Sequence, residues 1–339
     1  MATLPPEGKL LLYTNDGPVI LRHADDQPTS LQRPGETIWA DDLSPDGSEV
    51  LALPFQREPT GITREPRILV LADDTTDRRT VVRVGPRGDL GPVLWSPDGE
   101  RIAYRLTVYG VDPAKIHPFG RGQRTSLCTL DLGTKLARCF SGLGRVDGFD
   151  WSPDGRTLVV DVVGPRPLWL LDPASDLRSV LVPPRGRWIA RASLSEPVTF
   201  TSPEWSSSGR YVSAWVNNTP VVFHADGGLA AVGRQSQEFT EALGWSPTEE
   251  LFAYARGNPP YFTEIRLLDP RTGGDRRLIS TRGYPYITGL VWSPSGRWLA
   301  VLRWRSDFKQ RIDVIDVTGG QPPITAKRAD SPVLVDWGP

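Results

Sequence analysis

The sequence predicts an all-β fold: a single seven-bladed β-propeller domain over residues 1–339, whose ring is closed by the N-terminal strands together with the C-terminal strand. Three observations predict it. A short motif of the WSPDG type occurs seven times, its copies are 40 to 56 residues apart, and the intervals contain strand-like runs without helical periodicity. Repeats of this length are typical of four-stranded propeller blades.

The motif itself indicates a strand, a tight turn and a second strand. In VLWSPDGERIAY (93–104), Asp98 and Gly99 supply the side-chain bonding and the positive φ that such turns favour. Apolar residues then resume at period two with Ile102 and Tyr104. The copies are LSPDG at 43, WSPDG at 95 and 151, WSSSG at 205, WSPTE at 245, WSPSG at 292 and WGP at 337. We interpret the motif as the inner-strand corner of each blade, with its Trp packed between neighbouring blades.

The two ends of the chain indicate how the ring closes. The last motif, VLVDWGP, has no strand-like run after it, whereas KLLLYT, PVILRHA and TSLQ (9–32) precede the first motif. The simplest arrangement adds the C-terminal strand to the sheet that the N-terminal strands begin. Seven motifs then make seven blades, and closing the ring hides strand edges.

Composition excludes several classes of partner. The formal net charge of −1 gives no overall attraction to nucleic acid. No apolar run reaches 18 residues, so direct membrane insertion is not expected. The beginning, MATLPPEGKLLLY, has no pattern typical of a signal peptide. We expect a monomer.

The WSPDG motifs at 95 and 151, with the weaker copies elsewhere, resemble the repeats of the TolB-like, WD-repeat-like β-propeller family. Similar propellers occur in prolyl-oligopeptidase-type peptidases. The resemblance covers essentially the whole chain, and it concerns the propeller only, because no G-x-S-x-G nucleophile elbow is present. It implies the propeller fold and favours an extracytoplasmic location, with a role in an envelope assembly. Propellers carry unrelated activities, so the resemblance leaves the function open.

Catalytic motifs are scarce. The three histidines, His23, His117 and His224, fall in different predicted blades and lack metal-ligand spacing. No P-loop is present. We therefore lean towards a protein that is not an enzyme.

The two cysteines lie in neighbouring strand-like runs, TSLCTLDL and KLARCFSG. A two-residue turn at Gly133-Thr134 places Cys128 opposite Cys139, at a hydrogen-bonded pair whose Cβ atoms are less favourably placed for a bridge. The sequence leaves two alternatives open: buried free thiols, or a disulfide that would imply an oxidising compartment.

Acidic residues precede the motif Trp, or its Leu43 equivalent, in four repeats: Asp42, Asp150, Glu204 and Asp336. Positions two residues further back are mostly small, which suits a crowded central channel. If the acidic side chains tilt inwards, four carboxylates approach the channel at one level, with Asp336 beside Asp42 and Asp150 beside Glu204. Such a cluster could hold Ca²⁺, whereas the alternative is that the carboxylates cap turns and face water. We expect no other cofactor.

The long connections all join the second strand to the third, or one blade to the next, and therefore share one face. They are residues 56–67, 108–124, 183–197, 257–262, 281–286 and 304–309. Long connections in compact domains are often functional, and aromatic and Arg residues dominate interface hot spots. The predicted binding residues are Arg57, Arg64, Tyr109, Phe119, Arg121, Trp188, Arg191, Tyr261, Arg282, Tyr284, Tyr286, Trp304 and Arg305.

These observations favour a non-catalytic binding or scaffold propeller that recognises a protein or peptide partner through the long-loop face. The alternative is a lyase or hydrolase that acts on a sugar or small organic acid in the central funnel. The alternative lacks an identifiable general base or metal set, because the acidic residues on the long connections have no visible partner.

Overall fold

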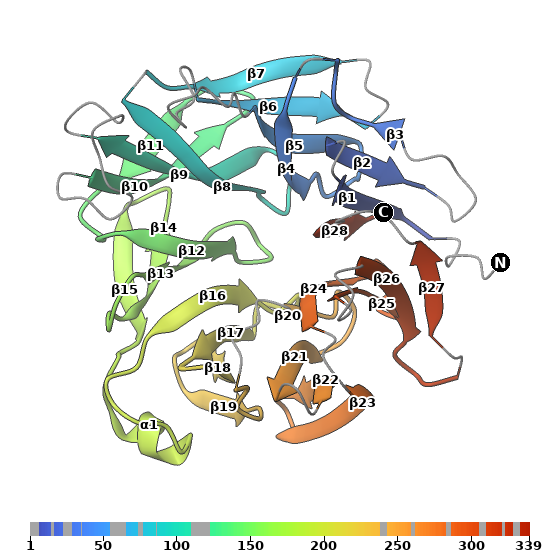
Figure 1. Cartoon of the computed structure of the whole chain (residues 1–339). Coiled ribbons are helices and arrows are strands. Elements are labelled where there is room, and N and C mark those ends of the chain that lie inside the picture. The colour runs from blue at the N-terminus through green and yellow to red at the C-terminus, as the bar shows by residue number, and fades with distance from the viewer. Residues whose placement is uncertain are drawn as a thin grey trace.

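The computed structural model describes residues 7–14, 17–22, 29–34, 36–54, 66–73, 77–85, 87–109, 123–237, 243–258, 262–282, 286–304, 310–320, 323–327 and 333–339. Seven four-stranded antiparallel sheets stand around a common axis as the blades of a propeller (Figure 1). The predicted all-β, seven-bladed fold is therefore confirmed.

Each blade is listed from its inner strand outwards. Blade 1 contains β4 (Ile38–Leu43), β5 (Glu49–Pro54), β6 (Arg67–Ala72) and β7 (Arg78–Arg83). Blade 2 contains β8 (Gly88–Trp95), β9 (Arg101–Tyr109), β10 (Gln123–Asp131) and β11 (Ala137–Phe140). Blade 3 contains β12 (Val146–Trp151), β13 (Leu158–Val162), β14 (Leu168–Asp172) and β15 (Leu177–Val182). Blade 4 contains β16 (Phe200–Trp205), β17 (Tyr211–Val216), β18 (Thr219–His224) and β19 (Leu229–Val232).

The remaining blades follow the same order. Blade 5 contains β20 (Leu243–Trp245), β21 (Phe252–Asn258), β22 (Phe262–Asp269) and β23 (Gly274–Arg282). Blade 6 contains β24 (Tyr286–Trp292), β25 (Trp298–Trp304), β26 (Gln310–Asp316) and β27 (Ile324–Lys327). Blade 7 contains β28 (Val333–Gly338), β1 (Lys9–Thr14), β2 (Gly17–Leu21) and β3 (Thr29–Ser30).

The ring closes in blade 7 as the sequence predicts. Strand β28 pairs antiparallel with β1, with Lys9 opposite Gly338 and Leu10 opposite Trp337. The Trp337 side chain is only 7% exposed and packs in one cluster with Leu10 and with Trp298 of blade 6. Its indole N–H donates to the backbone carbonyl of Glu7 at 3.1 Å. The two ends of the chain thus share a sheet and a hydrophobic cluster.

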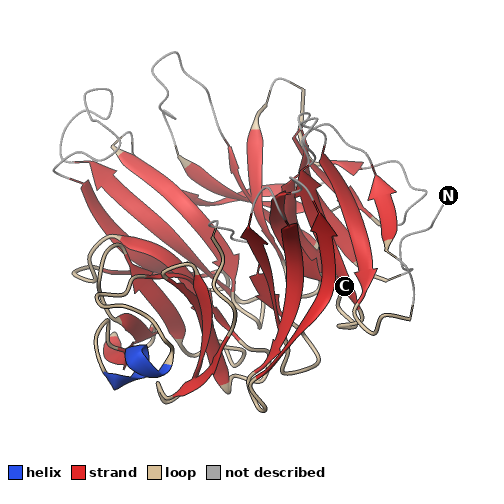
Figure 2. Cartoon of the chain, turned by 60° about the horizontal axis from the view of Figure 1, so that its bottom comes forward, coloured by secondary structure: helices blue, strands red, loops and turns tan. Residues whose placement is uncertain are grey.

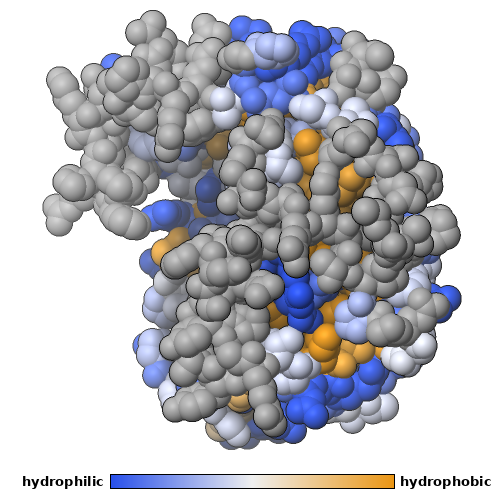
Figure 3. All heavy atoms as spheres, turned by 45° about the vertical axis from the view of Figure 1, so that its right-hand side comes forward, coloured by the Kyte–Doolittle hydropathy of each residue, from blue (hydrophilic) through white to orange (hydrophobic). Residues whose placement is uncertain are grey.

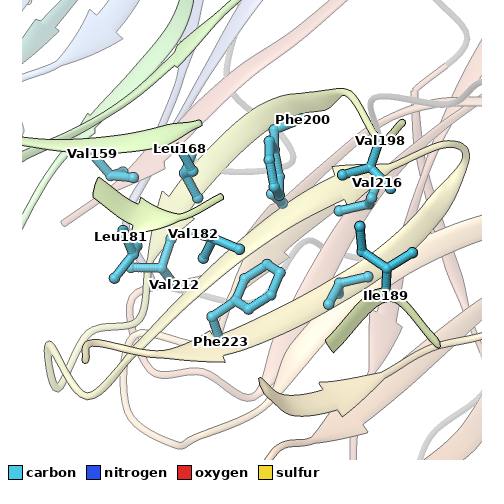
Figure 4. Packing of buried hydrophobic residues seen from close by; sticks show 12 residues of the cluster. Val159, Leu168, Leu181, Val182, Ile189, Val198, Phe200, Val212, Val216 and Phe223 are labelled. Atoms are coloured by element: carbon cyan, nitrogen blue, oxygen red, sulfur yellow. The ribbon is translucent and has the colours of Figure 1, made fainter. Parts of the chain in front are cut away.

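Most of the hydrophobic core lies between neighbouring blades. Figure 4 shows the cluster between blades 3 and 4, where Leu168 and Val182 face Phe200 and Phe223. Ile189 of the helix α1 (Arg187–Arg191) completes this cluster. α1 is the only helix among the described residues, and it lies at the outer edge of the ring (Figure 2). Burial between sheets is what holds the blades in place.

The repeated motif forms the turn that the sequence predicts. In blade 2 the Ser96 hydroxyl accepts a hydrogen bond from the Arg101 amide at 2.9 Å, and Asp98 accepts one from the Glu100 amide at 3.0 Å. Gly99 has a φ of +71°, a conformation that glycine adopts at little cost. The motif Trp side chains lie between blades: the Trp292 indole N–H donates to the Gly244 carbonyl of blade 5 at 2.9 Å. The motif therefore has a structural role at each blade corner.

The surface view in Figure 3 shows hydrophilic residues alternating with smaller hydrophobic areas on the described part of that face. Among the described residues, no helix is both long and apolar enough to span a bilayer.

Cys128 and Cys139 form a disulfide between β10 and β11. Their register is the predicted one, but the hairpin loop is longer than the predicted two-residue turn. The Asp131 amide donates to the Leu136 carbonyl, Lys135 has a φ of +60°, and the Asp131 carboxylate accepts hydrogen bonds from Thr134. The Cys pair consequently occupies a narrow position, with Cα atoms 4.1 Å apart, instead of the wider hydrogen-bonded pair that the two-residue turn implied.

Replacing Trp337 by Ala should test the ring closure. Removing a large, buried side chain that joins blade 7 to blade 6 should lower the free energy of unfolding by about 3–5 kcal/mol, measured by urea denaturation. The matched control is Trp39→Ala, because Trp39 also lies on an inner strand but is 43% exposed; its loss should cost about 1 kcal/mol. Equal losses for the two variants would contradict closure through β28.

Reduction of the disulfide should destabilise the protein. Opening a bridge between residues 11 apart in sequence should cost about 2–3 kcal/mol of unfolding free energy. Denaturation of the wild type should therefore shift on addition of dithiothreitol, while Cys139→Ser should start at the lower stability and show no shift. If dithiothreitol leaves the denaturation curve of the wild type unchanged, the disulfide is contradicted.

Candidate functional site

The two faces of the ring differ in how the strands are connected. The motif turns join first to second strands on one face, which we call the turn face, with its corners at Ser44, Ser96, Ser152, Ser206, Ser246 and Ser293. On the other face, the loop face, second strands lead to third strands and blades follow one another. The loop face carries the long connections 55–66, 110–122 and 183–199. Its described residues are the candidate binding surface.

Most of the predicted binding residues cannot be placed. Seven lie outside the described residues: Arg57, Arg64, Phe119, Arg121, Tyr261, Tyr284 and Arg305. For three more, only the backbone at a strand end is described: Arg282, Tyr286 and Trp304. Tyr109, Trp188 and Arg191 are described with their side chains. The predicted convergence of the whole set therefore stays a prediction.

Trp188 lies in α1, on the connection from blade 3 to blade 4, where it makes packing contacts. Its ring stacks on Phe200 with centroids 5.9 Å apart and meets Phe223 edge-on at 5.1 Å. Its indole N–H donates to the Pro183 carbonyl at 3.1 Å. Arg191, at the end of the same helix, is exposed. These contacts give Trp188 a structural role, while Arg191 remains accessible to a partner.

Tyr109 ends β9 at the loop face, and its hydroxyl donates to Asp89 at 3.3 Å. Burial raises the pKa of the Asp89 carboxyl above its ordinary value. Arg105, on the same strand, approaches the Asp147 carboxylate of blade 3 at 3.7 Å. Blades 2 and 3 thus present a tyrosine, an arginine and two acids near the loop end of the ring.

An aromatic pair that sequence reasoning did not single out lies nearby. The ring centroids of Tyr13 and Trp39 are 4.4 Å apart, although Tyr13 belongs to blade 7 and Trp39 to blade 1. Both residues lie towards the loop-face ends of their strands, and Trp39 keeps 43% of its surface exposed. An exposed Trp on an inner strand, rather than on a long connection, was the signal that could have identified it.

The four predicted acidic side chains do approach one another near the axis, and most of them bridge blades. Asp42 accepts a hydrogen bond from the Trp95 amide of the next blade at 2.7 Å. Asp150 accepts one from the Trp205 amide of the next blade at 2.7 Å, as well as one from its own neighbour Trp151.

Asp336 closes this series by accepting from its neighbour Trp337 at 2.7 Å and from the Leu43 amide of blade 1. β-Bulges precede the acidic positions in their inner strands, with register shifts at Ala40/Asp42, Val146/Phe149 and Thr201/Glu204, and between Leu334 and Asp336 opposite Leu11 and Leu12 of β1. A bulge re-aims the side chains that follow it, which is how these carboxylates reach a neighbouring sheet.

Glu204 differs from the other three acids. Among the described residues its carboxyl makes no hydrogen bond or ion pair. Burial, with a smaller contribution from the Asp150 charge, raises the pKa of Glu204 to about 8. Burial likewise raises the pKa of Asp150 to about 7 and that of Asp336 to about 6.

The charges of the acids also affect one another. Burial raises the pKa of Asp42 well above its ordinary value, and Asp336 raises it further. The described residues contain no group of three or more His, Cys, Asp or Glu side chains arranged to hold a metal ion. The Ca²⁺ site thus gains no geometric support from the described residues and stays a prediction.

Comparison with known proteins gives the fold alone. No protein-family model matches the chain, and no curated protein matches it in sequence. Among solved structures, TolB from Acinetobacter baumannii is similar, with 14% identity, a TM-score of 0.56 and coverage of 98% of this chain and 67% of that chain. The β-propeller domain of Cps50 (Swd1) from Myceliophteria thermophila has 10% identity, a TM-score of 0.61 and coverage of 88% and 90%. An oligogalacturonate lyase in complex with manganese has 15% identity, a TM-score of 0.60 and coverage of 96% and 85%. The similar folds thus include a TolB and an enzyme, and they leave the function open.

Replacing Glu204 by Gln should change how stability depends on pH. Because folding raises the pKa of Glu204 from an ordinary 4.5 to about 8, its contribution to stability is full below the unfolded pKa and is lost as the pH rises through the folded one. The variant should therefore match the wild type at about pH 5 and exceed its unfolding free energy by more than about 1 kcal/mol at about pH 9.

Urea denaturation at the two pH values measures this difference. Glu100→Gln, the same change at an exposed turn-face position, serves as the control and should track the wild type throughout. A Glu204→Gln effect of the same size at both pH values would contradict a raised pKa of the half-buried Glu204 carboxyl.

Proposed function

We propose that the protein is a non-catalytic binding module whose loop face docks a protein or peptide partner. The observation that carries this proposal is the exposed Trp39, held against Tyr13 at the junction of blades 7 and 1. A rigid, partly exposed aromatic residue supported by a second ring is the kind of anchor on which interfaces depend. The long connections on the same face supply further aromatic and arginine residues in sequence.

Two described arginines indicate the chemistry of the partner: Arg105 of blade 2, and Arg191 on the connection from blade 3 to blade 4. Arg105 and the exposed Arg191 can meet carboxylates, and arginine does so with a planar, bidentate geometry. Aromatic anchors and arginines together favour an extended or acidic chain. Electrostatic attraction between these groups would guide association and set its orientation.

The enzyme alternative, a lyase or hydrolase for a sugar or small organic acid, has support from the lyase among the similar folds. The described acids support it less. Asp42, Asp150 and Asp336 use their carboxylates on backbone amides, which leaves Glu204 without a second free carboxyl for paired acid–base work. A binding role needs no such pair.

The disulfide supports a location in an oxidising compartment, in agreement with the resemblance to TolB-like propellers. Bridges of this kind form and persist outside the reducing cytosol. We therefore place the proposed partner outside the cytoplasm as well.

Variants of the aromatic pair test the proposal. Proteins captured by the immobilised wild type from an extract of the native cells are identified by mass spectrometry, purified and titrated against each variant. Trp39→Ala and Arg191→Ala should each weaken binding about 5- to 100-fold, as expected for interface anchors, with little change in melting temperature. Glu100→Ala on the turn face, which is also exposed, should bind like the wild type.

Two results would contradict the binding face. One is a partner whose affinity is unchanged in Trp39→Ala and Arg191→Ala. The other is a loss of affinity that is just as large in Glu100→Ala. Turnover of a sugar or organic acid that disappears in Glu204→Gln, with no effect of Trp39→Ala, would favour the enzyme alternative.

A further inference from the structure

A cavity of about 570 Å³ lies at the axis of the ring, at its turn-face end. Prolines of the motif turns line it, among them Pro45, Pro247 and Pro294, so it is reached from the side opposite the proposed partner surface. Volumes of 300–1,000 Å³ are about the range of small-molecule sites.

Beside the cavity, two neighbouring blades carry a residue that is not acidic at the position before the motif Trp. At the position where blades 1, 3, 4 and 7 carry Asp or Glu, blade 5 has Gly244 and blade 6 has Val291, and both line the cavity. Glu204 of blade 4 and Asp336 of blade 7 flank this gap. An apolar stretch is thus bounded by two carboxyl groups.

The walls between those carboxyls offer hydrocarbon and aromatic surface. Trp245, Trp292 and Trp337 line the cavity, and the indole N–H of each is already donated, to Ser213 at 3.0 Å, to Gly244 at 2.9 Å and to Glu7 at 3.1 Å. The described residues that line the cavity include no lysine, arginine or histidine. The charged side chains that line the cavity are therefore all acidic.

The two carboxyls are not equivalent. Asp336 already accepts from two backbone amides, whereas the Glu204 carboxyl makes no hydrogen bond or ion pair among the described residues. Glu204 is half-buried, and a carboxylate that is partly removed from water is stabilised by a cation or by hydrogen-bond donors. Within this cavity, a positively charged group would supply the partner that the Glu204 carboxylate lacks among the described residues.

We propose that the axial cavity binds a small organic cation, a protonated amine or guanidine on an apolar body, with its charge against Glu204 and its body against the Trp292 and Trp245 walls. A cation gains from aromatic faces as well as from the carboxylate. An organic ion fits better than a metal ion, because no described group of acidic side chains is arranged as a metal site. This site is separate from the proposed partner surface and does not depend on it.

Calorimetric titration with tryptamine, a flat amine, tests the proposal on the full chain. The titration is done at about pH 9, where the Glu204 carboxyl carries its charge and the amine is still protonated. Tryptophol replaces the ammonium by a hydroxyl and serves as the matched neutral probe. Tryptamine should bind at one site, and tryptophol should bind at least about tenfold more weakly.

Two variants locate the site. Glu204→Gln keeps the shape of the side chain and should lower the affinity for tryptamine at least about tenfold. The control is Glu249→Gln, at an exposed glutamate on the turn that follows Pro247; it should leave the affinity unchanged. Gly244→Val should block the cavity. A Cβ at residue 244 would lie 3.5 Å from the nearest Trp292 atom, an ordinary contact, and blade 6 already carries a valine at the same position.

The outcomes separate the possibilities. Tryptamine binding that is lost in Glu204→Gln and Gly244→Val, at an unchanged melting temperature, supports the site. The proposal is overturned if neither probe binds at millimolar concentration, if tryptophol binds as well as tryptamine, or if both variants bind like the wild type. It is also overturned if Ca²⁺ alone raises the melting temperature through Glu204 and tryptamine does not, since the site would then be a metal site.

Discussion

The structure depends on one antiparallel pairing, that of the last strand of the chain with the first. Each of the other six blades is made from consecutive strands, and those strands can pair as soon as they are synthesised. Blade 7 is different, because β28 and β1 are separated by nearly the whole chain. Until they meet, blades 1 and 6 have no neighbour on one side, and the hydrophobic cluster around Trp337 and Trp298 is incomplete. Contacts of such sequence separation form late and carry a large entropic cost.

The carboxylate bridges at the axis extend this closure around part of the ring. A propeller holds its blades together mainly by apolar packing, which is not directional. The bonds from Asp336 to Leu43, from Asp42 to Trp95 and from Asp150 to Trp205 add directional contacts at the inner edge. They fix the height of one inner strand relative to the next. Blades 5 and 6 carry Gly244 and Val291 at this position, and both residues line the axial cavity.

The repeat in the sequence was sufficient to predict the number of blades, the closing strand and the acids at the axis, because all three depend on spacing. It could not reveal that the acids bond to backbone amides, since this requires the inner-strand bulges, which leave no simple pattern of residues. Cys128 was matched with Cys139 correctly, but the prediction that they form a wide, hydrogen-bonded pair was wrong. The Asp131 carboxylate and the positive φ of Lys135 make a longer loop than the predicted two-residue turn. Trp188 was chosen for its place on a long connection, whereas its contacts with Phe200 and Phe223 come from the folding of α1 against blades 3 and 4. Trp39 was missed for the opposite reason, because a tryptophan within a strand is usually expected to be buried in the hydrophobic core.

The disulfide has a further consequence for the outer rim of blade 2. The outermost strand of a blade has a partner on one side only, so it is the first to fray, and a frayed edge is open to proteases and to pairing with other chains. Strand β11 has only four residues, and its neighbour Leu136 is 70% exposed, so its own packing would hold it weakly. A covalent link to β10, through the fully buried Cys128, makes this edge open only together with the strand inside it. The bridge thereby turns a peripheral hairpin into part of the cooperative unit.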